Sequence, residues 1–311
     1  MVYQNQKVKV KAVRDSKNSP SQLSPLQCHS VRSSISKAMG GLFSAKPWRT
    51  MPESREGNLS FVKSYQPGNK EVKHLRILLH GPVGAGKSSF FNSVDSVLQG
   101  RITNRASTDA TSGSSHTLQY KTYKIHEDPR KTYPFVFNDI MGFEKQKGVI
   151  VEDVKLALSG HVREGYEFKP DKQLMEGDEG YNPSPTLDDR VHVLVCVAPA
   201  DAVSLLSKEV VMKMREVRLA ASRMGIPQLA ILTKVDEACA ESQSDISNVY
   251  KREYTKNQVD KFSGLLGIQP NHIFLVKNYH SESITSDDID ALILFALKQM
   301  ITSGDDFLND M

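Results

Sequence analysis

The sequence has little of what marks secreted or membrane proteins. Only three of its 311 residues are cysteine, at positions 28, 196 and 239, and this wide spacing suits neither a disulfide framework nor a zinc site. The apolar run at 291–297 is far shorter than the roughly 20 residues that cross a bilayer. The N-terminus alternates Lys and Val where a secretory signal has an apolar run. We therefore expect a soluble, cytoplasmic protein without a transmembrane span.

Charge is distributed unevenly along the chain. The net charge is only +4, but residues 1–80 hold 14 basic and 4 acidic side chains, whereas residues 81–311 hold 26 and 32. Residues 1–45 are rich in Ser, Lys and Arg and poor in large apolar residues, so they cannot offset the entropy cost of ordering, and we predict a disordered basic arm. Because the arm does not interleave aromatic with basic residues, a solvated tail is favoured over contact with nucleic acid or acidic lipid.

The rest of the chain alternates between short apolar runs and longer amphipathic stretches. We expect a lead-in segment with a short helix at 46–70, a main domain at 71–303 and a C-terminal tail at 304–311. Strands are predicted at 74–80, 118–125, 133–138, 191–197, 228–232 and 273–276, and helices at 87–98, 205–224, 256–266 and 289–302. Apolar strands interleaved with helices indicate an α/β fold, with a mainly parallel sheet covered by helices on both faces.

A phosphate-binding motif follows the first predicted strand. Residues 81–88, GPVGAGKS, match the pattern G-x-x-x-x-G-K-[ST] and lead into a predicted helix. The glycines allow backbone N–H groups to surround phosphate oxygens, and the helix N-terminus adds positive charge there. Lys87 is expected to reach the β- and γ-phosphates, and Ser88 to bind Mg²⁺. The predicted phosphate-binding residues are Gly81, Gly84, Ala85, Gly86, Lys87, Ser88 and Ser89.

A D-x-x-G motif at Asp139 and Gly142 comes directly after a predicted core strand. Ligands of open α/β sheets bind at this edge, so we expect Asp139 to hold Mg²⁺ through water and the Gly142 N–H to meet the γ-phosphate; an ordinary turn is the alternative. A third ligand of Mg²⁺, a hydroxyl, should come from the polar stretch 106–117. Thr117 is favoured over Thr111 because it directly precedes a predicted strand, and it is the single candidate catalytic residue.

The motif at 233–236, TKVD, follows another predicted strand and favours guanine. The Asp236 carboxylate can accept hydrogen bonds from N1–H and the exocyclic amino group of guanine, which adenine does not present in that arrangement. The Lys234 stem can lie over the base, beside Thr233. Asn278, in the loop after the strand at 273–276, is expected to approach the base as well. Solvated loop charges are the alternative interpretation of this motif.

Together these elements resemble a P-loop GTPase-like domain, and several blocks narrow the resemblance to the interferon-induced protein 44 family. The blocks are KPWR, LRILLHGPVGAGKSSFFNSV, NDIMG, LDDRVHVLVCV, LAILTKVDE, FLVKNY and LILFALKQMITSGDDFLND, which together span nearly all of 46–310. The resemblance implies a cytoplasmic, interferon-responsive protein of the immune and antiviral response that binds GTP or GDP with Mg²⁺. Members of the family often carry an additional N-terminal domain, so we expect a short form that lacks it.

The position after the D-x-x-G glycine is occupied by Phe143, where small signalling GTPases have a Gln. Phenylalanine can neither orient water nor offset charge, and the substitutes for these two tasks are Glu144 or Gln146 and Arg101 or Arg105. We therefore expect slow or partner-dependent hydrolysis. The alternative is a non-catalytic interaction scaffold with a GTPase-like fold; an ATP-dependent phosphotransferase is disfavoured by Asp236.

Two segments are candidate surfaces for a protein partner. The stretch from Asp139 to Thr233 is longer than a minimal GTPase domain needs, and the excess forms an insertion at 143–190 that is rich in Gly and Pro. Long irregular segments in compact domains are commonly functional. Because this one follows the nucleotide-sensing glycine, it is a candidate switch, as is the loop at 105–117; a passive surface loop is the alternative for the insertion.

Overall fold

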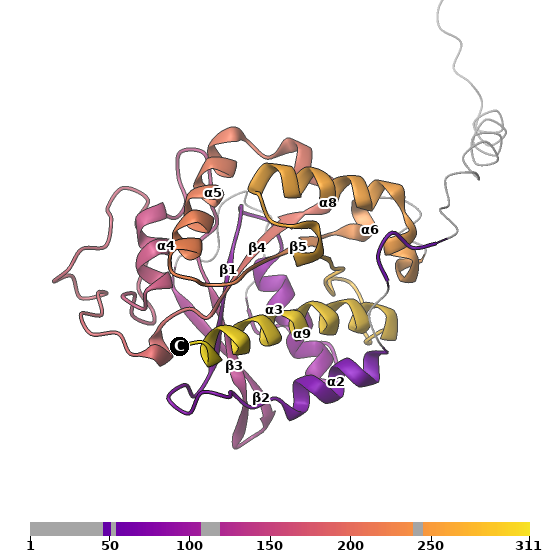
Figure 1. Cartoon of the computed structure of the whole chain (residues 1–311), viewed down its shortest axis with the longest axis horizontal. Helices are drawn as coiled ribbons and strands as arrows, with labels where there is room; N and C mark the ends of the chain where they lie inside the picture. Colours follow the sequence, from indigo (N-terminus) through magenta and orange to yellow (C-terminus); the bar gives the residue numbers. More distant parts are fainter. Residues whose placement is uncertain (1–45, 51–53, 107–118, 239–244) are drawn as a thin grey trace, which may run out of the picture. The chain divides into compact units, whose positions relative to one another are not determined.

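The computed structural model describes residues 46–50, 54–106, 119–238 and 245–311, which all fall within one compact unit, Ser44–Met311 (Figure 1). The predicted arm at 1–45 lies outside the described residues. Among the described helices, none combines the length and apolar character needed to span a bilayer.

Six strands form one sheet in the order β2-β3-β1-β4-β5-β6. The strands are β1 (Leu75–His80), β2 (Lys121–Asp128), β3 (Lys131–Asp139), β4 (Val193–Pro199), β5 (Gln228–Thr233) and β6 (Ile273–Leu275). All neighbours pair in parallel except β2 and β3, which form an antiparallel hairpin at one edge. The predicted α/β fold with a mainly parallel sheet is confirmed.

Helices cover both faces of the sheet, each over its own apolar core (Figure 1). Buried side chains of α4, α5 and α8 pack on one face, and those of α2, α3 and α9 pack on the other. The helices are α2 (Arg55–Ser64), α3 (Lys87–Gln99), α4 (Val151–Leu158), α5 (Lys208–Arg223), α6 (Val235–Ala238), α8 (Glu253–Leu266) and α9 (Asp287–Asn309). Central strands buried on both faces explain why the sequence shows continuous apolar runs there.

The last helix is longer than the sequence predicted. α9 continues to Asn309, so the predicted tail at 304–311 is wrong for most of its length. Gly304 allows this, because a Cβ there would lie 2.5 Å from Val193 Cγ2 and 2.8 Å from Leu75 Cδ1. Leu308, four residues on, is again buried. The helix therefore stays against the sheet at a point where any side chain would force it away.

The lead-in segment belongs to the same compact unit as the main domain. Its helix α2 packs against α9, and the Arg55 guanidinium lies 2.8 Å from Oδ2 of the fully buried Asp290. The other carboxylate oxygen of Asp290 accepts a 2.6 Å hydrogen bond from the Tyr279 hydroxyl. Tyr279 directly follows Asn278, so α2 is linked through one buried carboxylate to the loop after β6.

The other end of the lead-in covers the free edge of β6. The Trp48 ring packs edge-on against Tyr250 at 5.2 Å, and the Arg49 guanidinium donates to the carbonyl of Ile273. The Tyr250 hydroxyl accepts the Leu275 N–H at 3.1 Å. Outward-facing polar groups of this edge strand are therefore bonded to side chains of the same chain, which removes a template for strand addition.

The insertion at 143–190 is packed against the domain. It contains α4 and a short helix, η1 (Leu187–Asp189), and the buried Asp153 of α4 accepts the Leu174 N–H at 2.9 Å. Backbone hydrogen bonds from Tyr120 N–H to Tyr166 and from Gly165 N–H to Tyr120, at 2.8 and 2.9 Å, attach it to the segment before β2. The insertion is therefore a segment with its own core contacts, and these contacts do not distinguish a switch from a passive surface.

Two histidines are buried in the sheet as neutral side chains. Burial, assisted by the nearby Lys87, lowers the pKa of His80 to about 3. Burial also lowers the pKa of His192 to about 4, although its hydrogen bond to the Leu187 carbonyl acts in the opposite direction. Both values lie below the ordinary 6.5, so the unfolded chain binds protons that the folded chain does not.

Stability should therefore fall on acidification. Between pH 7.5 and pH 5, we expect each of the two histidines to lower the free energy of unfolding by about 2 kcal/mol, measured by urea denaturation at each pH. His80→Phe should remove about 2 kcal/mol of this pH dependence, whatever its effect on absolute stability. An unchanged slope in that variant would contradict a neutral, buried His80.

Candidate phosphate- and base-binding site

The phosphate-binding motif forms a loop between β1 and α3, as predicted. Gly84 and Gly86 have φ angles of 73° and 88°, in the left-handed region that favours glycine. Gly86 is the N-cap of α3, and Lys87 and Ser88 open the helix, with Ser89 half-buried in its first turn. Backbone N–H groups at the start of a 13-residue helix are therefore available to an anion in the loop.

The Lys87 side chain turns back into this loop. Its Nζ lies 3.2 Å from the Pro82 carbonyl and 3.4 Å from that of Gly81, and only 7% of the residue is exposed. Burial lowers the pKa of Lys87, and the carboxylate of Asp139 opposes that shift. A cation held in a partly desolvated loop is a strong point of attraction for phosphate oxygens.

Ser88 and Asp139 meet although 51 residues separate them. The parallel register of β1 and β3 sets Leu79 opposite Asp139, and the Ser88 Oγ donates to Asp139 Oδ2 at 2.6 Å. A hydroxyl beside a carboxylate fits the oxygen ligands that Mg²⁺ takes in phosphate sites. No group of three His, Cys, Asp or Glu in the described ranges could hold a metal, so phosphate and water would complete the coordination shell. Thr111 and Thr117 lie outside the described residues.

The D-x-x-G segment is bonded to the phosphate loop. The Phe143 N–H donates to the Gly81 carbonyl at 3.0 Å, and the Val83 N–H donates to the Phe143 carbonyl at 3.4 Å. Gly142 is required here, because a Cβ would lie 2.7 Å from the Val83 side chain. The Phe143 ring is buried and meets His80 edge-on at 5.9 Å. The segment that should sense the γ-phosphate is therefore anchored in the core.

The TKVD motif also contacts the phosphate loop. The buried Thr233 hydroxyl donates to the Ala85 carbonyl at 2.6 Å. Lys234 has a φ of 56°, the single positive value among described non-glycine residues, and its Nζ lies 3.3 Å from Glu237. This turn directs the chain from β5 into α6, which begins at Val235 and contains Asp236.

Asp236 is held by a residue whose role the sequence did not reveal. The Lys277 Nζ lies 3.7 Å from Asp236 Oδ2 and 2.9 Å from Glu282 Oε1. The next residue, Asn278, donates its amide to the Gly86 carbonyl at 3.1 Å, and its Oδ1 is buried without a partner among the described residues. The loop after β6 therefore joins the carboxylate expected to read the base to the phosphate loop.

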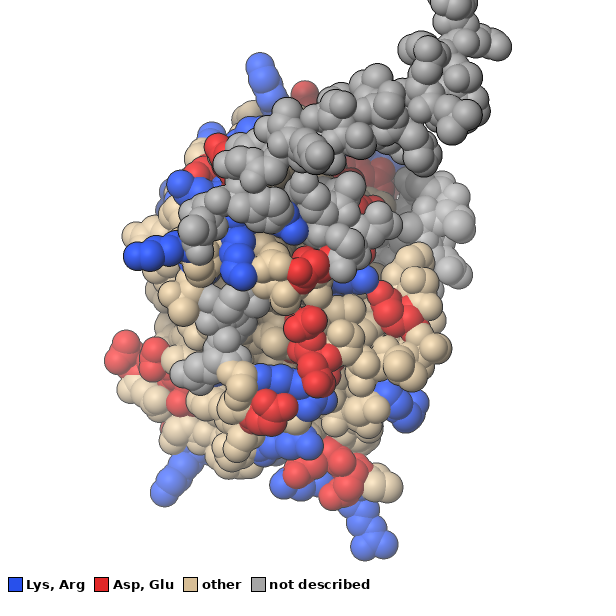
Figure 2. Space-filling model, turned by 90° about the vertical axis from the view of Figure 1, so that its right-hand side faces the viewer, with Lys and Arg blue, Asp and Glu red and all other residues tan. Residues whose placement is uncertain are grey.

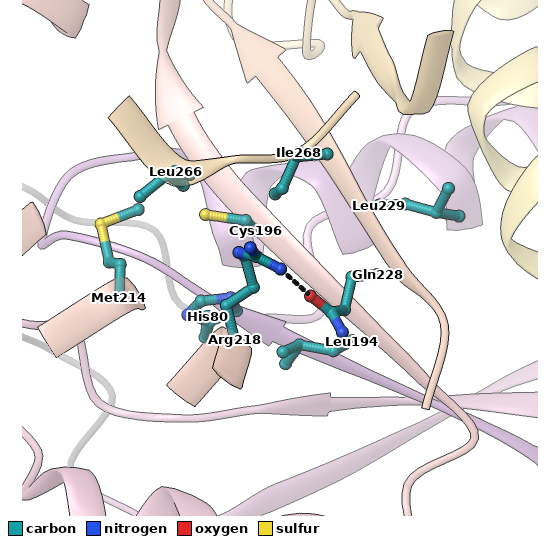
Figure 3. A pocket seen from close by; sticks show the side chains of 9 residues that line it. All are labelled: His80, Leu194, Cys196, Met214, Arg218, Gln228, Leu229, Leu266 and Ile268. Carbon is teal, nitrogen blue, oxygen red and sulfur yellow. Dashed lines mark hydrogen bonds between the residues drawn. The ribbon is translucent and has the colours of Figure 1, made fainter. Parts of the chain in front are cut away.

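A small void lies behind the site, between the sheet and helices α5 and α8 (Figure 3). His80, Cys196 and Met214 are among its lining residues, and Arg218 donates to Gln228 at 3.2 Å at one end. It is too narrow for a water molecule. We therefore assign it no ligand.

The sequence is similar to several curated proteins. It is 35% identical to interferon-induced protein 44 of Homo sapiens, and equally to that of Pan troglodytes, over 261 residues that cover 83% of this chain and 59% of the relative. It is 34% identical to the Mus musculus protein, covering 81% and 60%, and 33% identical to human interferon-induced protein 44-like, covering 83% and 58%.

The chain is homologous to interferon-induced protein 44. It spans about three-fifths of the length of these relatives. No family model matches the chain.

Solved structures of GTP-binding proteins also superpose on the chain. Toc33 from Arabidopsis thaliana in complex with GDP and Mg²⁺ has 15% identity and a TM-score of 0.41, covering 84% of this chain and 94% of that one. A probable GTP-binding protein engB has 12% identity and a TM-score of 0.38, covering 76% and 99%. Likenesses at this level carry no argument about the site, which depends on the contacts above.

In this homologue of interferon-induced protein 44, the structure brings every described predicted site residue to the same end of the sheet. What the sequence missed was Lys277, because its partner Asp236 lies 41 residues earlier and only the pairing of β5 with β6 makes them neighbours. The signal that could have found it is its position directly after β6, beside a loop already assigned to the base.

The Thr233 hydroxyl provides a test of how the site is held together. Thr233→Val should leave the buried Ala85 carbonyl without its 2.6 Å partner and lower the free energy of unfolding by about 1–3 kcal/mol, measured by urea denaturation. Thr233→Ser keeps the hydroxyl and should retain most of that stability. Equal stability of the valine variant and the wild type would contradict this role.

Proposed function

We propose that this protein is a guanine-nucleotide-binding protein that holds GTP or GDP with Mg²⁺ and hydrolyses GTP slowly or only with a partner. The observation that carries the proposal is the convergence of Lys87, Ser88, Asp139 and Asp236 at one end of the sheet, at the β1 switch point where open α/β sheets bind ligands. The names of its relatives support an interferon-induced protein. We further propose that it acts in the immune and antiviral response, in the cytoplasm.

Guanine selection is assigned to Asp236. Its carboxylate is 23% exposed and lies in a fixed position beside Lys277, so it can accept two hydrogen bonds from guanine. An adenine base would offer this carboxylate neither donor, so it would lose both hydrogen bonds and bind less tightly. The same argument disfavours an ATP-dependent phosphotransferase.

We expect GTP to displace a fluorescent GTP analogue at least about 100-fold more effectively than ATP. Asp236→Ala should remove the preference. Asp236→Asn should weaken GTP and strengthen XTP, because the amide can donate to the 2-oxo group that xanthine carries. Lys87→Ala, which removes the phosphate contact and leaves the base contact intact, should weaken all three nucleotides together. Base-independent binding by the wild type would overturn the guanine assignment.

Slow hydrolysis follows from the position of Phe143. Its ring is buried against His80, and both its N–H and its carbonyl are bonded to the phosphate loop. Mg²⁺, when bound, would offset charge on the β- and γ-phosphates. Ser88 and Asp139 would hold and orient it, and Lys87 would bind the same phosphates. None of these residues activates water, and the nearby Arg105 is bonded to Asp95 at 3.1 Å.

In a single-turnover assay with purified protein and GTP·Mg²⁺, we expect a rate constant at or below that of unassisted small GTPases, about 10⁻⁴ s⁻¹. Ser88→Ala should weaken the Mg²⁺ dependence of nucleotide affinity without changing the base preference. Fast turnover of the purified chain would contradict the assignment of Phe143, and would do so without affecting the guanine assignment.

An interaction scaffold with a GTPase-like fold is the second candidate. It is favoured by the number of contacts that hold the phosphate loop from within the chain, through Thr233, Asn278 and Phe143. In that case nucleotide would stabilise the fold by linkage and Lys87→Ala would leave partner binding unchanged. The packed insertion at 143–190 is the proposed partner surface; the loop at 105–117 lies mostly outside the described residues.

Nucleic acid is not proposed as a partner. On the face seen in Figure 2, acidic and basic side chains are interspersed and neither forms a continuous patch. Nucleic-acid surfaces need a dominant basic area, because phosphate contacts supply most of the affinity.

A further inference from the structure

Helix α5 carries an apolar ridge that no described residue covers. Met212 and Leu219 of this helix are 68% and 50% exposed. They are seven residues apart within the helix, the spacing of a helix–helix seam. We call these two residues the α5 seam. Leu205, which is 81% exposed, ends a separate 3-10 helix, and the extended residues Leu206 and Ser207 separate it from α5. Large exposed apolar side chains arranged in a line mark an interaction surface more often than scattered ones do.

Two rows of charge flank the α5 seam with the same period. Lys208 and Arg215 form a basic row on one side, and Glu209 and Glu216 form an acidic row on the other; all four are exposed. Arg215 donates to the Leu265 carbonyl of α8, so the basic row lies toward α8.

The acidic row lies on the opposite side, because Glu216 pairs with Lys155 of α4 at 2.6 Å. α5 lies between α4 and α8 (Figure 1), so these two helices flank the seam.

We propose that the α5 seam docks a second copy of this chain, with the two α5 helices side by side and parallel. A two-fold axis parallel to the helices brings the seam of one copy against the seam of the other. The same rotation makes the basic row of each copy face the acidic row of the other. An antiparallel pair would set Lys208 beside the other copy's Arg215, and Glu209 beside the other copy's Glu216. The charges thus select both the partner and its orientation.

A single helix pair buries an area at the low end of specific interfaces, so the dimer is reversible and concentration-dependent. The interaction is separate from the nucleotide site, since no seam residue belongs to it. An experiment that contradicts the proposed dimer therefore leaves the proposed nucleotide binding untouched, and the reverse also holds.

Sedimentation velocity of the full chain, between about 1 and 100 µM, tests the association. We expect a shift from monomer to dimer across this range. Met212→Glu should abolish the shift, whereas the matched Met175→Glu, at a methionine 58% exposed outside the seam, should retain it. A wild type that stays monomeric throughout, or equal effects of both substitutions, would overturn the proposal.

Reversing one row at a time tests the charge argument. The all-acidic variant Lys208→Glu/Arg215→Glu and the all-basic variant Glu209→Lys/Glu216→Lys should each be monomeric alone and form a heterodimer when mixed. Thermal unfolding of each variant establishes that it is folded. Failure of the mixture to associate, or wild-type self-association of either variant, would overturn the pairing of the rows.

Cross-linking reports the orientation. In a chain with Cys28→Ser and Cys239→Ser, Leu219→Cys should form a dimer with a short bismaleimide, because the two positions meet in a parallel pair. Cys196 is buried and should not react. In an antiparallel pair centred on Met212 the two sulfurs would be separated by about 21 Å along the helices, so absence of the cross-link would rule out the parallel arrangement.

Discussion

Parallel pairing of β1 with β3 on one side and β4 on the other is the constraint on which the rest of the structure depends. It aligns Leu79 with Asp139, so a hydroxyl at the start of α3 meets a carboxylate from the end of β3. Because β1 is a central strand, helices cover it on both faces and its side chains are buried. Without this register the phosphate loop would still form, but Ser88 would have no carboxylate beside it to help bind Mg²⁺.

The phosphate loop is held by three segments that are far apart in the chain. Thr233 bonds to Ala85, Asn278 to Gly86 and Phe143 to Gly81. Each comes from the carboxyl end of a different strand, and each bond occupies a backbone carbonyl of the loop. Three carbonyls of the loop are thus bonded to the protein itself, and the N–H groups at the start of α3 are the ones that an anion can use.

Much of the fold and of the site could be predicted from the sequence because the signals are local. The strand and helix before and after Gly81–Ser88 follow from an apolar run and a glycine-rich turn, and Asp139 and Thr233 each end a β-branched or aromatic strand. The sequence could not show that α9 continues to Asn309. Gly304 has a low helix propensity and so predicts a helix end, and only the structure shows that Val193 lies against it and leaves no room for a side chain.

The sequence by itself therefore determined the phosphate loop, the α/β alternation and the residue types that favour guanine, because each depends on contiguous backbone. Only the tertiary structure decided that Lys277 lies beside Asp236, that the ring of Phe143 is turned into the core, and that Leu205, Met212 and Leu219 stay exposed. These features depend on strand order and on which helix neighbours which. Short-range sequence patterns carry no information about such features. A contact such as Lys277 with Asp236 joins residues that are distant in the chain, and an exposed side chain is one that no other element covers.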